Sequence, residues 1–200
     1  TGSRALASAM AFHKGLTNQR VAAAGVQTAK HVIYEAETEP DADALAALLE
    51  GDITHLVLKP IQNGSSIDVH VRVSVDEAVT LLQQLRQKYN QIMVEQYLSG
   101  REVTVGVVDA LRDTAYYVLP VLEILPPDDH RFYSYEAKYT SVTRLDCPAA
   151  LSAVERDAVS TMAQTVHQTM DLRHYSRSDF ILVNGTPYFL EVNTLPGLTE

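Results

Sequence analysis

The sequence of 200 residues contains no tryptophan and only one cysteine, Cys147. A single cysteine excludes an intramolecular disulfide framework and a zinc site built from several cysteines. It is compatible with the reducing cytoplasm, where we expect the protein to reside. No apolar run approaches the roughly 18 residues that span a membrane, and no secretory leader is visible, so we expect no membrane association.

Basic residues are also scarce. Lysine and arginine number 16 against 25 aspartates and glutamates, which gives a net charge of −9. A general nucleic-acid binder requires a basic face, so we expect no nucleic-acid partner. The deficit does not exclude a nucleotide site, because a few local lysines and arginines suffice there. Hydrophobic residues make up 46% of the chain, which allows a packed core.

Helix and strand patterns are mixed along the chain, which favours an α+β fold over a doubly wound sheet. We expect helices over residues 4–25 (interrupted near Gly15), 40–51, 74–90 and 148–171. We expect strands over residues 31–35, 54–60, 66–73, 92–98, 101–109, 115–125, 179–183 and 188–192. The inner stripe of the last helix is predicted to be Val154, Ala158, Met162, Val166 and Met170.

The last two strands carry oxygen-bearing side chains. Asp179 begins the first strand, Glu191 ends the second, and Asn193 shares a face with Glu191 in an extended chain. A three-residue loop at 184–186 would set Asp179 opposite Glu191, whereas a loop of two or four residues would shift the pairing by one. Such a donor set suits a hard cation like Mg²⁺. The alternative is a solvated hairpin end with incidental acids. Arg177 points the same way and could pair with an acid or bind an anion.

Two further segments have the character of nucleotide-binding elements. Lys59 ends a strand and is followed by Gly64-Ser65-Ser66, a loop whose N–H groups and hydroxyls could face an anion, although the Walker A spacing is absent. Glu95 and Glu102 flank a turn, where one acidic strand end could meet an adenine edge and the other acid could accept from ribose hydroxyls. An ordinary β-turn and a solvated turn are the respective alternatives.

Taken in chain order, Lys14, "KP…GSS", "VEQYLSGREVTV", "YEAKY" and "RSDF…YFLEVNTLPG" resemble the ATP-grasp domain of the D-alanine-D-alanine ligase family. The resemblance covers essentially the whole chain. It implies two α+β lobes that enclose a nucleotide cleft. Residues 1–99 would form the smaller lobe with its leading helix, and residues 100–200 the larger lobe with the metal site. It also implies that the family's N-terminal substrate lobe and C-terminal end lie outside this chain.

The resemblance implies an ATP-dependent ligase of the cytoplasm that joins two D-alanines through an acyl phosphate for peptidoglycan precursor synthesis. The cofactors would be ATP and two Mg²⁺ or Mn²⁺ ions. The substrate would be D-alanine, and the full-length protein would be a homodimer. We expect the isolated 200 residues to bind nucleotide and magnesium but to synthesise no measurable dipeptide.

Carried over residue by residue, the resemblance implies four groups of site residues. The cations that contact the ATP phosphates would be Lys14, Lys59 and Lys138. The nucleoside would be held by Glu95, the backbone of Gln96 and Leu98, and, at the ribose, Glu102. The metal ligands would be Asp179, Glu191 and Asn193. The network over D-alanine would include Ser65 and Tyr139, and the tetrahedral intermediate would be stabilised by Arg177 and the backbone of Gly197.

The sequence departs from the family pattern at two positions. Asp68 stands where the family usually has glycine, and a carboxylate there would repel triphosphate and displace or stiffen the loop. His13 stands where aspartate is common, and we expect little effect from it. Tyr139 replaces the histidine of relatives that use D-lactate, which favours the dipeptide. The competing readings are an ATP-grasp carboxylate-amine ligase of other specificity and a catalytically impaired nucleotide-binding module.

Overall fold

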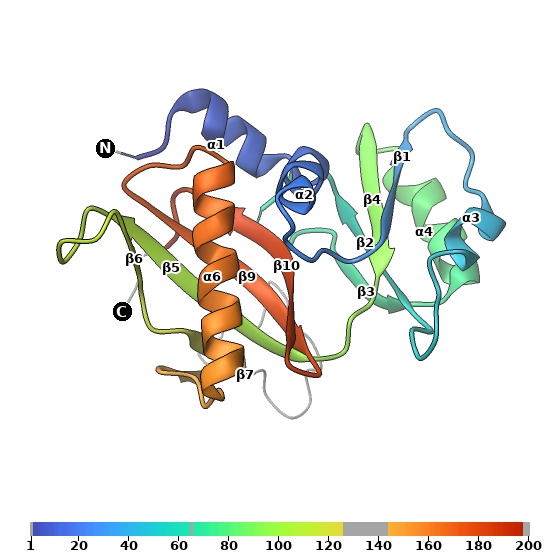
Figure 1. Cartoon of the computed structure of the whole chain (residues 1–200). Helices are drawn as coiled ribbons and strands as arrows, with labels where there is room; N and C mark the ends of the chain where they lie inside the picture. The colour runs from blue at the N-terminus through green and yellow to red at the C-terminus, as the bar shows by residue number, and fades with distance from the viewer. Residues whose placement is uncertain (1, 65, 126–143, 198–200) are drawn as a thin grey trace. The chain divides into compact units, whose positions relative to one another are not determined.

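A computed structural model of the chain describes residues 2–64, 66–125 and 144–197 (Figure 1). The chain divides into two compact units. Unit 1 comprises Thr1–Thr28 and Ser99–Glu200, and unit 2 comprises Ala29–Leu98. The sequence analysis predicted that the leading helix belongs to the smaller lobe. In the structure, the contacts of this segment lie in unit 1. The reason is that Ala7, Ala11 and Val21 are buried in the same core as Phe189 of the last strand.

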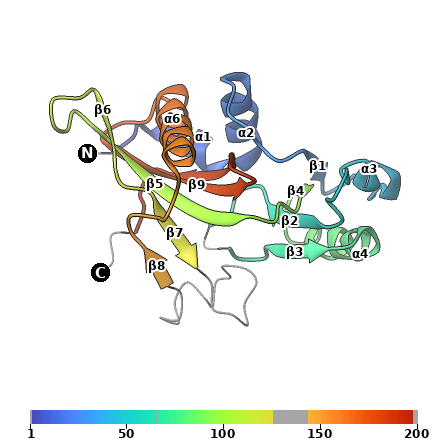
Figure 2. The same cartoon turned by 60° about the horizontal axis from the view of Figure 1, so that its bottom comes forward.

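Unit 1 is a sheet with helices on one face (Figures 1 and 2). The strands run in the order β10-β9-β5-β7-β8, with β6 paired to β5, and all these pairs are antiparallel. Their bounds are β5 Arg101–Asp109, β6 Tyr116–Val118, β7 Leu122–Leu125, β8 Arg144–Asp146, β9 Tyr175–Val183 and β10 Thr186–Asn193. The helices are α1 Ala5–Phe12, α2 Lys14–Ala23 and α6 Ala153–Thr169.

The core of unit 1 lies between α6 and the sheet. Val103, Val105 and Val107 alternate along β5 and are buried, as the sequence pattern predicts. The predicted strand over 115–125 is instead two strands, because Leu119-Pro120 separates β6 from β7 and proline has no N–H for the ladder. The predicted stripe of α6 is correct at Val166 and Met170, which are buried, and at Met162, which is partly buried and packs against the core, but it is wrong at Val154, which is 77% exposed.

Unit 2 is a four-stranded antiparallel sheet with strand order β1-β4-β2-β3. The strands are β1 His31–Glu35, β2 Leu56–Pro60, β3 His70–Val73 and β4 Gln91–Gln96, and the helices are α3 Ala42–Ala46 and α4 Val75–Leu85. α4 packs against β2, and α3 packs against α4. Its core includes Leu45, Leu56, Leu58, Leu82 and Ile92.

Helix starts follow local capping chemistry. Ser74 and Glu77 form the capping box that their spacing predicts for α4. α3 is shorter than predicted and begins after Asp41, whose carboxylate accepts from the N–H groups of Asp43 and Ala44. The break in the leading helix falls at His13, not at Gly15, because the His13 ring caps the start of α2.

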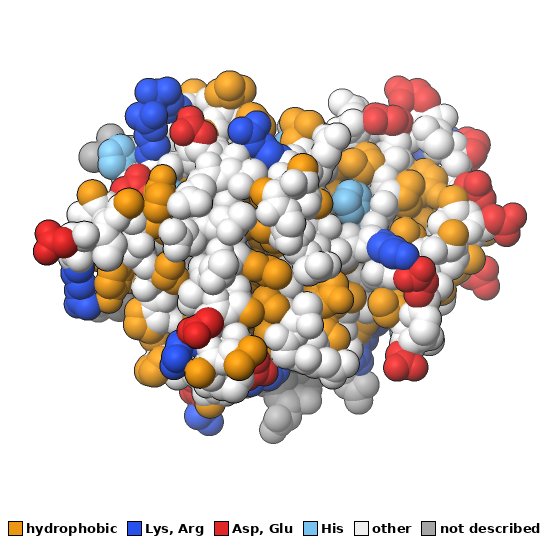
Figure 3. Space-filling view, in the orientation of Figure 1, with side chains coloured by type: hydrophobic (Ala, Val, Ile, Leu, Met, Phe, Trp, Pro, Cys, Tyr) orange, Lys and Arg blue, Asp and Glu red, His pale blue; other side chains and the backbone are white. Residues whose placement is uncertain are grey.

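The surface of unit 2 is strongly acidic around α3 (Figure 3). The exposed acids there are Glu35, Glu37, Glu39, Asp41, Asp43, Glu50 and Asp52. Such a patch repels the phosphate backbone of a nucleic acid, so a polyanion would have to bind at a basic surface elsewhere on the protein.

None of the helices that the structure describes has the length and apolar character that crossing a bilayer demands.

Candidate functional site

The β9–β10 hairpin brings the predicted metal ligands together by an unexpected route. The turn is the two-residue Asn184-Gly185, because Val183 pairs with Thr186. That turn alone would misalign Asp179 and Glu191 by one residue. The register shifts between Phe189 and Glu191, where one extra residue, Leu190, forms a bulge. The bulge cancels the shift, so Asp179 pairs with Glu191 after all.

Asp179 is the centre of a polar cluster at this end of the sheet. Arg177 donates to both of its carboxylate oxygens, with Nε and Nη2 at 3.0 Å each. The hydroxyl of Thr104, which faces Asp179 from β5, donates to Oδ1 at 2.5 Å. The Asn193 amide lies 3.4 Å from Oδ2. Glu191 is the cross-strand neighbour, so one further acid, one arginine, one hydroxyl and one amide lie around Asp179, which is only 8% exposed.

The electrostatics of this cluster suit a cation. Burial raises the pKa of the Asp179 carboxyl, Arg177 opposes that rise, and the negative charge of Glu191 adds to it. Two neighbouring carboxylates in a buried setting repel each other unless positive charge is supplied. Here Arg177 supplies part of it, and a hard divalent ion would meet only oxygen donors from Asp179, Glu191 and Asn193.

Within the described ranges, no three histidine, cysteine, aspartate or glutamate side chains gather as a metal site. A cation held here would therefore rely on two carboxylates, one amide and ligands from outside the protein. Gly197 is exposed and follows β10 by four residues in the chain. A Cβ at Gly197 would meet no atom of the described residues within 4 Å.

Lys59 and Glu95 form a buried ion pair in unit 2. The Lys59 ammonium lies 2.6 Å from Glu95 Oε1, and their side chains are 8% and 7% exposed. Both lie on the paired strands β2 and β4, which fixes their separation. Sequence analysis identified both residues but not their pairing. The ion pair gives each of the two buried charges a partner of opposite sign.

The other residues predicted to contact the nucleoside agree with their predicted roles to different degrees. The N–H of Gln96 donates to the Lys30 carbonyl at 3.0 Å, and its side-chain amide donates to Leu48 O at 2.7 Å. The Gln96 N–H is therefore committed within unit 2 and is not a donor for adenine. Leu98 is half-buried just after β4, and Glu102 lies on β5 of unit 1, so Glu95 and Glu102 belong to different units.

Lys14 is the first residue of α2 and is 9% exposed. It belongs to unit 1 and not, as predicted, to the lobe of Lys59. His13 before it accepts from the Leu16 N–H through Nδ1 at 3.2 Å and so caps α2. Aspartate is also a strong N-cap residue, which explains why either residue serves at this position and agrees with the small effect expected of the change.

A polar contact that sequence analysis missed holds the loop between β2 and β3. The Tyr89 hydroxyl donates to Asp68 Oδ2 at 2.5 Å, and the Lys88 ammonium lies 3.6 Å from the same oxygen. Asp68 has a φ of 53°, in the left-handed region where glycine is preferred. A tyrosine 21 residues away leaves no sequence signal for such a contact. The predicted residues Ser65, Lys138 and Tyr139 lie outside the described residues.

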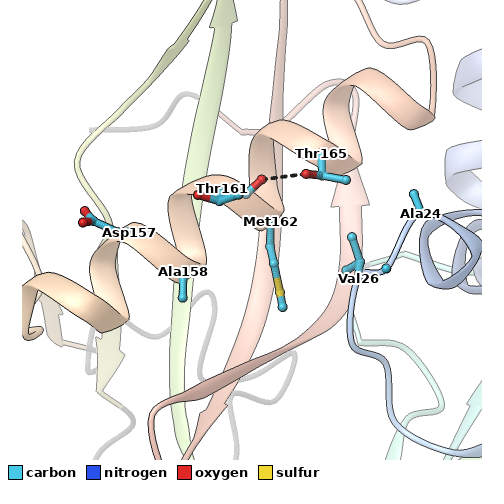
Figure 4. A pocket seen from close by; sticks show the side chains of 8 residues that line it. Ala24, Val26, Asp157, Ala158, Thr161, Met162 and Thr165 are labelled. Atoms are coloured by element: carbon cyan, nitrogen blue, oxygen red, sulfur yellow. Dashed lines mark hydrogen bonds between the residues drawn. The ribbon is translucent and has the colours of Figure 1, made fainter.

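A hollow in unit 1 lies between α6 and the segment after α2 (Figure 4). Small and apolar side chains line much of it, with Thr161 and Thr165 joined by a hydrogen bond of 2.9 Å from the Thr165 hydroxyl to the Thr161 carbonyl. Its charged lining residue is Asp157, and it contains none of the predicted site residues. A hollow without cations does not suit a triphosphate.

Comparisons with known proteins point to one family. Residues 21–200 match the family model described as D-ala D-ala ligase C-terminus. The D-alanine–D-alanine ligase of Syntrophobacter fumaroxidans is 34% identical over 99% of the chain, and the match covers 62% of that protein. The chain thus spans about three fifths of such a relative.

Solved structures show the same fold. The Bacillus anthracis D-alanine–D-alanine ligase complexed with ATP is 25% identical and superimposes with a TM-score of 0.80, over 100% of this chain and 60% of that one. The VanG D-Ala:D-Ser ligase of Enterococcus faecalis is 26% identical with a TM-score of 0.78, over 99% of this chain and 56% of that one. These likenesses confirm the predicted α+β, ATP-grasp fold. The chain belongs to the D-alanine–D-alanine ligase family and corresponds to its C-terminal domain.

Proposed function

We propose that the chain is the ATP-binding part of an ATP-dependent ligase that joins two D-alanines through an acyl phosphate, for peptidoglycan precursors in the cytoplasm. The observation that carries the proposal is the pairing of Asp179 with Glu191 at the end of a hairpin in a chain of this family. The full-length enzyme is proposed to be a homodimer, with D-alanine and ATP as its ligands.

Two divalent ions, Mg²⁺ or Mn²⁺, are proposed to be held by Asp179, Glu191 and Asn193. All three donors are oxygens, and the mutual repulsion of the two acids supports a cation between them. The ions would supply charge neutralisation for phosphoryl transfer. The hydroxyl of Thr104 orients Asp179, whose carboxylate also accepts from Arg177 and Asn193, so a bound cation would replace at least one of these donors.

The cationic side chains act on the phosphates and on the oxyanion. Lys59 and Lys14 would contact the phosphates, and Glu95 holds the Lys59 ammonium in place through an ion pair of 2.6 Å within unit 2. Arg177 is oriented by its two bonds to Asp179, and its guanidinium would stabilise an oxyanion that forms at this end of the hairpin. The backbone at Gly197 would serve the same oxyanion.

A ligase with a different acceptor is the second candidate. The observation that favours it is the similarity to the VanG D-Ala:D-Ser ligase, which is nearly as close as that to the ATP-complexed D-alanine–D-alanine ligase. The described residues of the chain do not discriminate between acceptors. A catalytically impaired module is less well supported, because the Asp68 carboxylate is engaged by Tyr89 and Lys88.

The test has two parts. Calorimetry of the 200-residue chain with ATP and MgCl₂ should show binding that EDTA abolishes. Phosphate release and product masses should then be measured for the protein in its full natural length, with D-alanine alone and with D-serine or D-lactate added. D-alanyl-D-alanine as the main product supports the proposal. A mixed product supports the second candidate, and an absence of nucleotide binding overturns both.

A further inference from the structure

Helix α1 exposes its larger apolar side chains and buries its smaller ones. Leu6 is 74% exposed and Phe12 is 54% exposed, whereas the buried residues of the helix are two alanines, Ala7 and Ala11. A surface helix normally has the opposite distribution, with its apolar side chains turned toward the core. The exposed residues of α1 recur at steps of three and four and so share one outer face: Ala5, Leu6, Ala9 and Phe12.

The helix carries no charged side chain. Between Ala5 and Phe12 the sequence contains no aspartate, glutamate, lysine, arginine or histidine. The inner side of α1 contacts α2 and β10, and the helix lies at the edge of unit 1 (Figure 1). A helix that is apolar on all sides is typical of a protein interior. The outer face is therefore suited to a cover that the described residues do not supply.

The charge of the chain indicates which partner can approach this face. The net charge is −9, and exposed acids gather around α3 of unit 2 (Figure 3). Two copies of the chain therefore repel each other wherever their acidic surfaces meet. The outer face of α1 carries no acid, and the residue directly before the helix is the exposed Arg4. A second copy of the chain can approach here without bringing carboxylates together.

A two-fold axis at Ala9 would make the outer face complementary to itself. In such a contact, the same patch of both subunits meets in reciprocal pairs. If the two helices are antiparallel, Leu6 lies opposite Phe12 of the partner subunit, because each is three residues from Ala9. Alanine at the axis lets the helices approach closely. Arg4 then lies at the C-terminal end of the partner subunit's α1, where the helix dipole favours a positive charge.

We propose that the outer face of α1 is a contact between two copies of this chain, in which the two α1 helices pack antiparallel across a two-fold axis near Ala9. The proposal deepens the homodimer of the proposed function and rests on it. Leu6 and Phe12 are the side chains that the contact buries, as the apolar centre of an interface requires. The residues proposed to bind ATP and metal all lie outside α1.

The first experiment is analytical ultracentrifugation of the protein in its full natural length, with the variants Leu6→Glu and Phe12→Glu. We expect the dissociation constant of the dimer to rise at least about tenfold in each, because each variant places an acid in the apolar contact. Val154→Glu is the matched control, since Val154 is a 77% exposed apolar residue on another helix of unit 1. It should leave the dimer unchanged.

The second experiment tests the axis itself. Ala9→Cys, in a chain that also carries Cys147→Ser, should give a disulfide-linked dimer on mild oxidation, because a close approach at the axis brings the two Cβ atoms within reach of such a bond. Ala153→Cys, at an exposed alanine of α6, should stay monomeric on a denaturing gel. Absence of the cross-link at position 9 would overturn the axis.

A charge exchange separates loss of the contact from loss of folding. The chain with Leu6→Glu and Phe12→Glu and the chain with Leu6→Lys and Phe12→Lys should each be monomeric alone. Mixed, they should form a heterodimer, because each acid then lies opposite a base across the axis. Failure of the mixture to associate would contradict the antiparallel pairing of Leu6 with Phe12.

A protein that is monomeric at all concentrations, or a dimer that Leu6→Glu and Phe12→Glu leave unchanged, would overturn the α1 contact. Slow amide exchange of α1 in such a monomer would mean that another part of the same longer chain covers this face. These outcomes leave ATP binding and ligation unaffected. Conversely, a dimer that responds to both variants but neither binds ATP nor ligates would overturn the proposed ligase and leave the contact intact.

Discussion

Asp179 and Glu191 are cross-strand neighbours because two irregularities of the β9–β10 hairpin cancel. The two-residue turn shifts the pairing by one position, and the bulge at Leu190 shifts it back. A bulge also increases the local twist of its strand. The two carboxylates consequently share one end of the sheet with Arg177, and each is within the influence of the other's charge.

Replacing Glu191 by glutamine should move stability and metal-dependent binding in opposite directions. The change removes the charge that raises the pKa of Asp179, so the free energy of unfolding should increase by about 0.5–1 kcal/mol. It also removes one of the proposed anionic ligands of Mg²⁺, so the affinity for ATP with Mg²⁺ should fall by at least about tenfold. Urea denaturation and calorimetry measure the two quantities.

The control for Glu191→Gln is Asp157→Asn, which neutralises an exposed acid on α6. It should leave both quantities unchanged. If Glu191→Gln retains full Mg²⁺-dependent ATP affinity, Glu191 is not a metal ligand, whatever the effect on stability.

The buried pair of Lys59 and Glu95 gives a second prediction. Lys59→Met leaves Glu95 charged and unpaired in the core, which should destabilise unit 2 by about 3–5 kcal/mol. The double variant Lys59→Met/Glu95→Leu should recover most of that loss, because apolar side chains of similar volume often replace a buried ion pair. ATP binding should not recover, since the lysine proposed to contact the phosphates is gone.

The matched control is Lys30→Met, which breaks the exposed pair of Lys30 with Glu50, also 2.6 Å long. Exposed pairs contribute little, so its effect on unfolding should stay below about 1 kcal/mol. Normal ATP affinity in the double variant would contradict a phosphate role for Lys59 while leaving the structural role intact.

Much of the fold could be predicted because its signals are local. The capping box of Ser74 and Glu77 and the alternating valines of β5 need only a few neighbouring residues. The predicted stripe on α6 leaves the core at Val154 because steps of four residues turn 400° and drift by about 40° each time around the helix. The buried face instead mixes steps of four and three, through Val159, Ala163, Val166 and Met170.

The candidate site was predictable as a set of residues but not as a set of contacts. Asp179, Glu191 and Asn193 were selected by residue type and spacing, yet their alignment depends on the Leu190 bulge, which has no distinctive sequence. Thr104 and Tyr89 were missed because each reaches its partner across many residues of chain, Asp179 and Asp68 respectively. Pairing at long sequence separation is decided by packing, which a single sequence does not display.

Stability should fall in mild acid because of a buried histidine. His167 is fully buried, with Nδ1 2.7 Å from the Ser176 hydroxyl and Nε2 2.8 Å from Asp109 Oδ1. Burial lowers the pKa of His167 below its ordinary value of 6.5, although Asp109 opposes the shift. Ser176 is only 2% exposed, so this trio is part of the core and not a hydrolytic site.

The direction of this pH dependence follows from the difference in proton binding by His167 between the folded and the unfolded chain. The unfolded chain takes up the proton near pH 6.5, whereas folded His167 does so only at lower pH. The contribution of neutral His167 to the free energy of unfolding is fully present above pH 6.5. It is lost as the pH falls through 6.5 toward the pKa of His167 in the folded chain. His167→Gln should reduce this loss in urea unfolding between pH 7.5 and 5, and His55→Gln is the control at an exposed position. If the free energy of unfolding of His167→Gln fell with pH as steeply as that of the unchanged chain, the assignment of this pH dependence to His167 would be contradicted.

Gly100, which directly precedes β5, should tolerate no side chain. A Cβ there would lie 2.4 Å from the Leu182 carbonyl oxygen and 2.7 Å from the Ile181 side chain. A backbone oxygen held in β9 has little freedom to move, so Gly100→Ala should lower the free energy of unfolding by about 1–3 kcal/mol. Because Asp179 lies three residues before Leu182 on β9, a displaced strand should also weaken Mg²⁺-dependent ATP binding.

Gly106→Ala is a matched control on β5. Its Cβ would also meet an atom at 2.7 Å, but that atom is the terminal Cδ1 of Leu119, which is 39% exposed and free to rotate. Gly106→Ala should therefore change the free energy of unfolding by less than about 1 kcal/mol and leave ATP binding unaffected. Equal destabilisation by the two variants would mean that strand propensity, and not the close approach of the Leu182 backbone, explains the glycine at position 100.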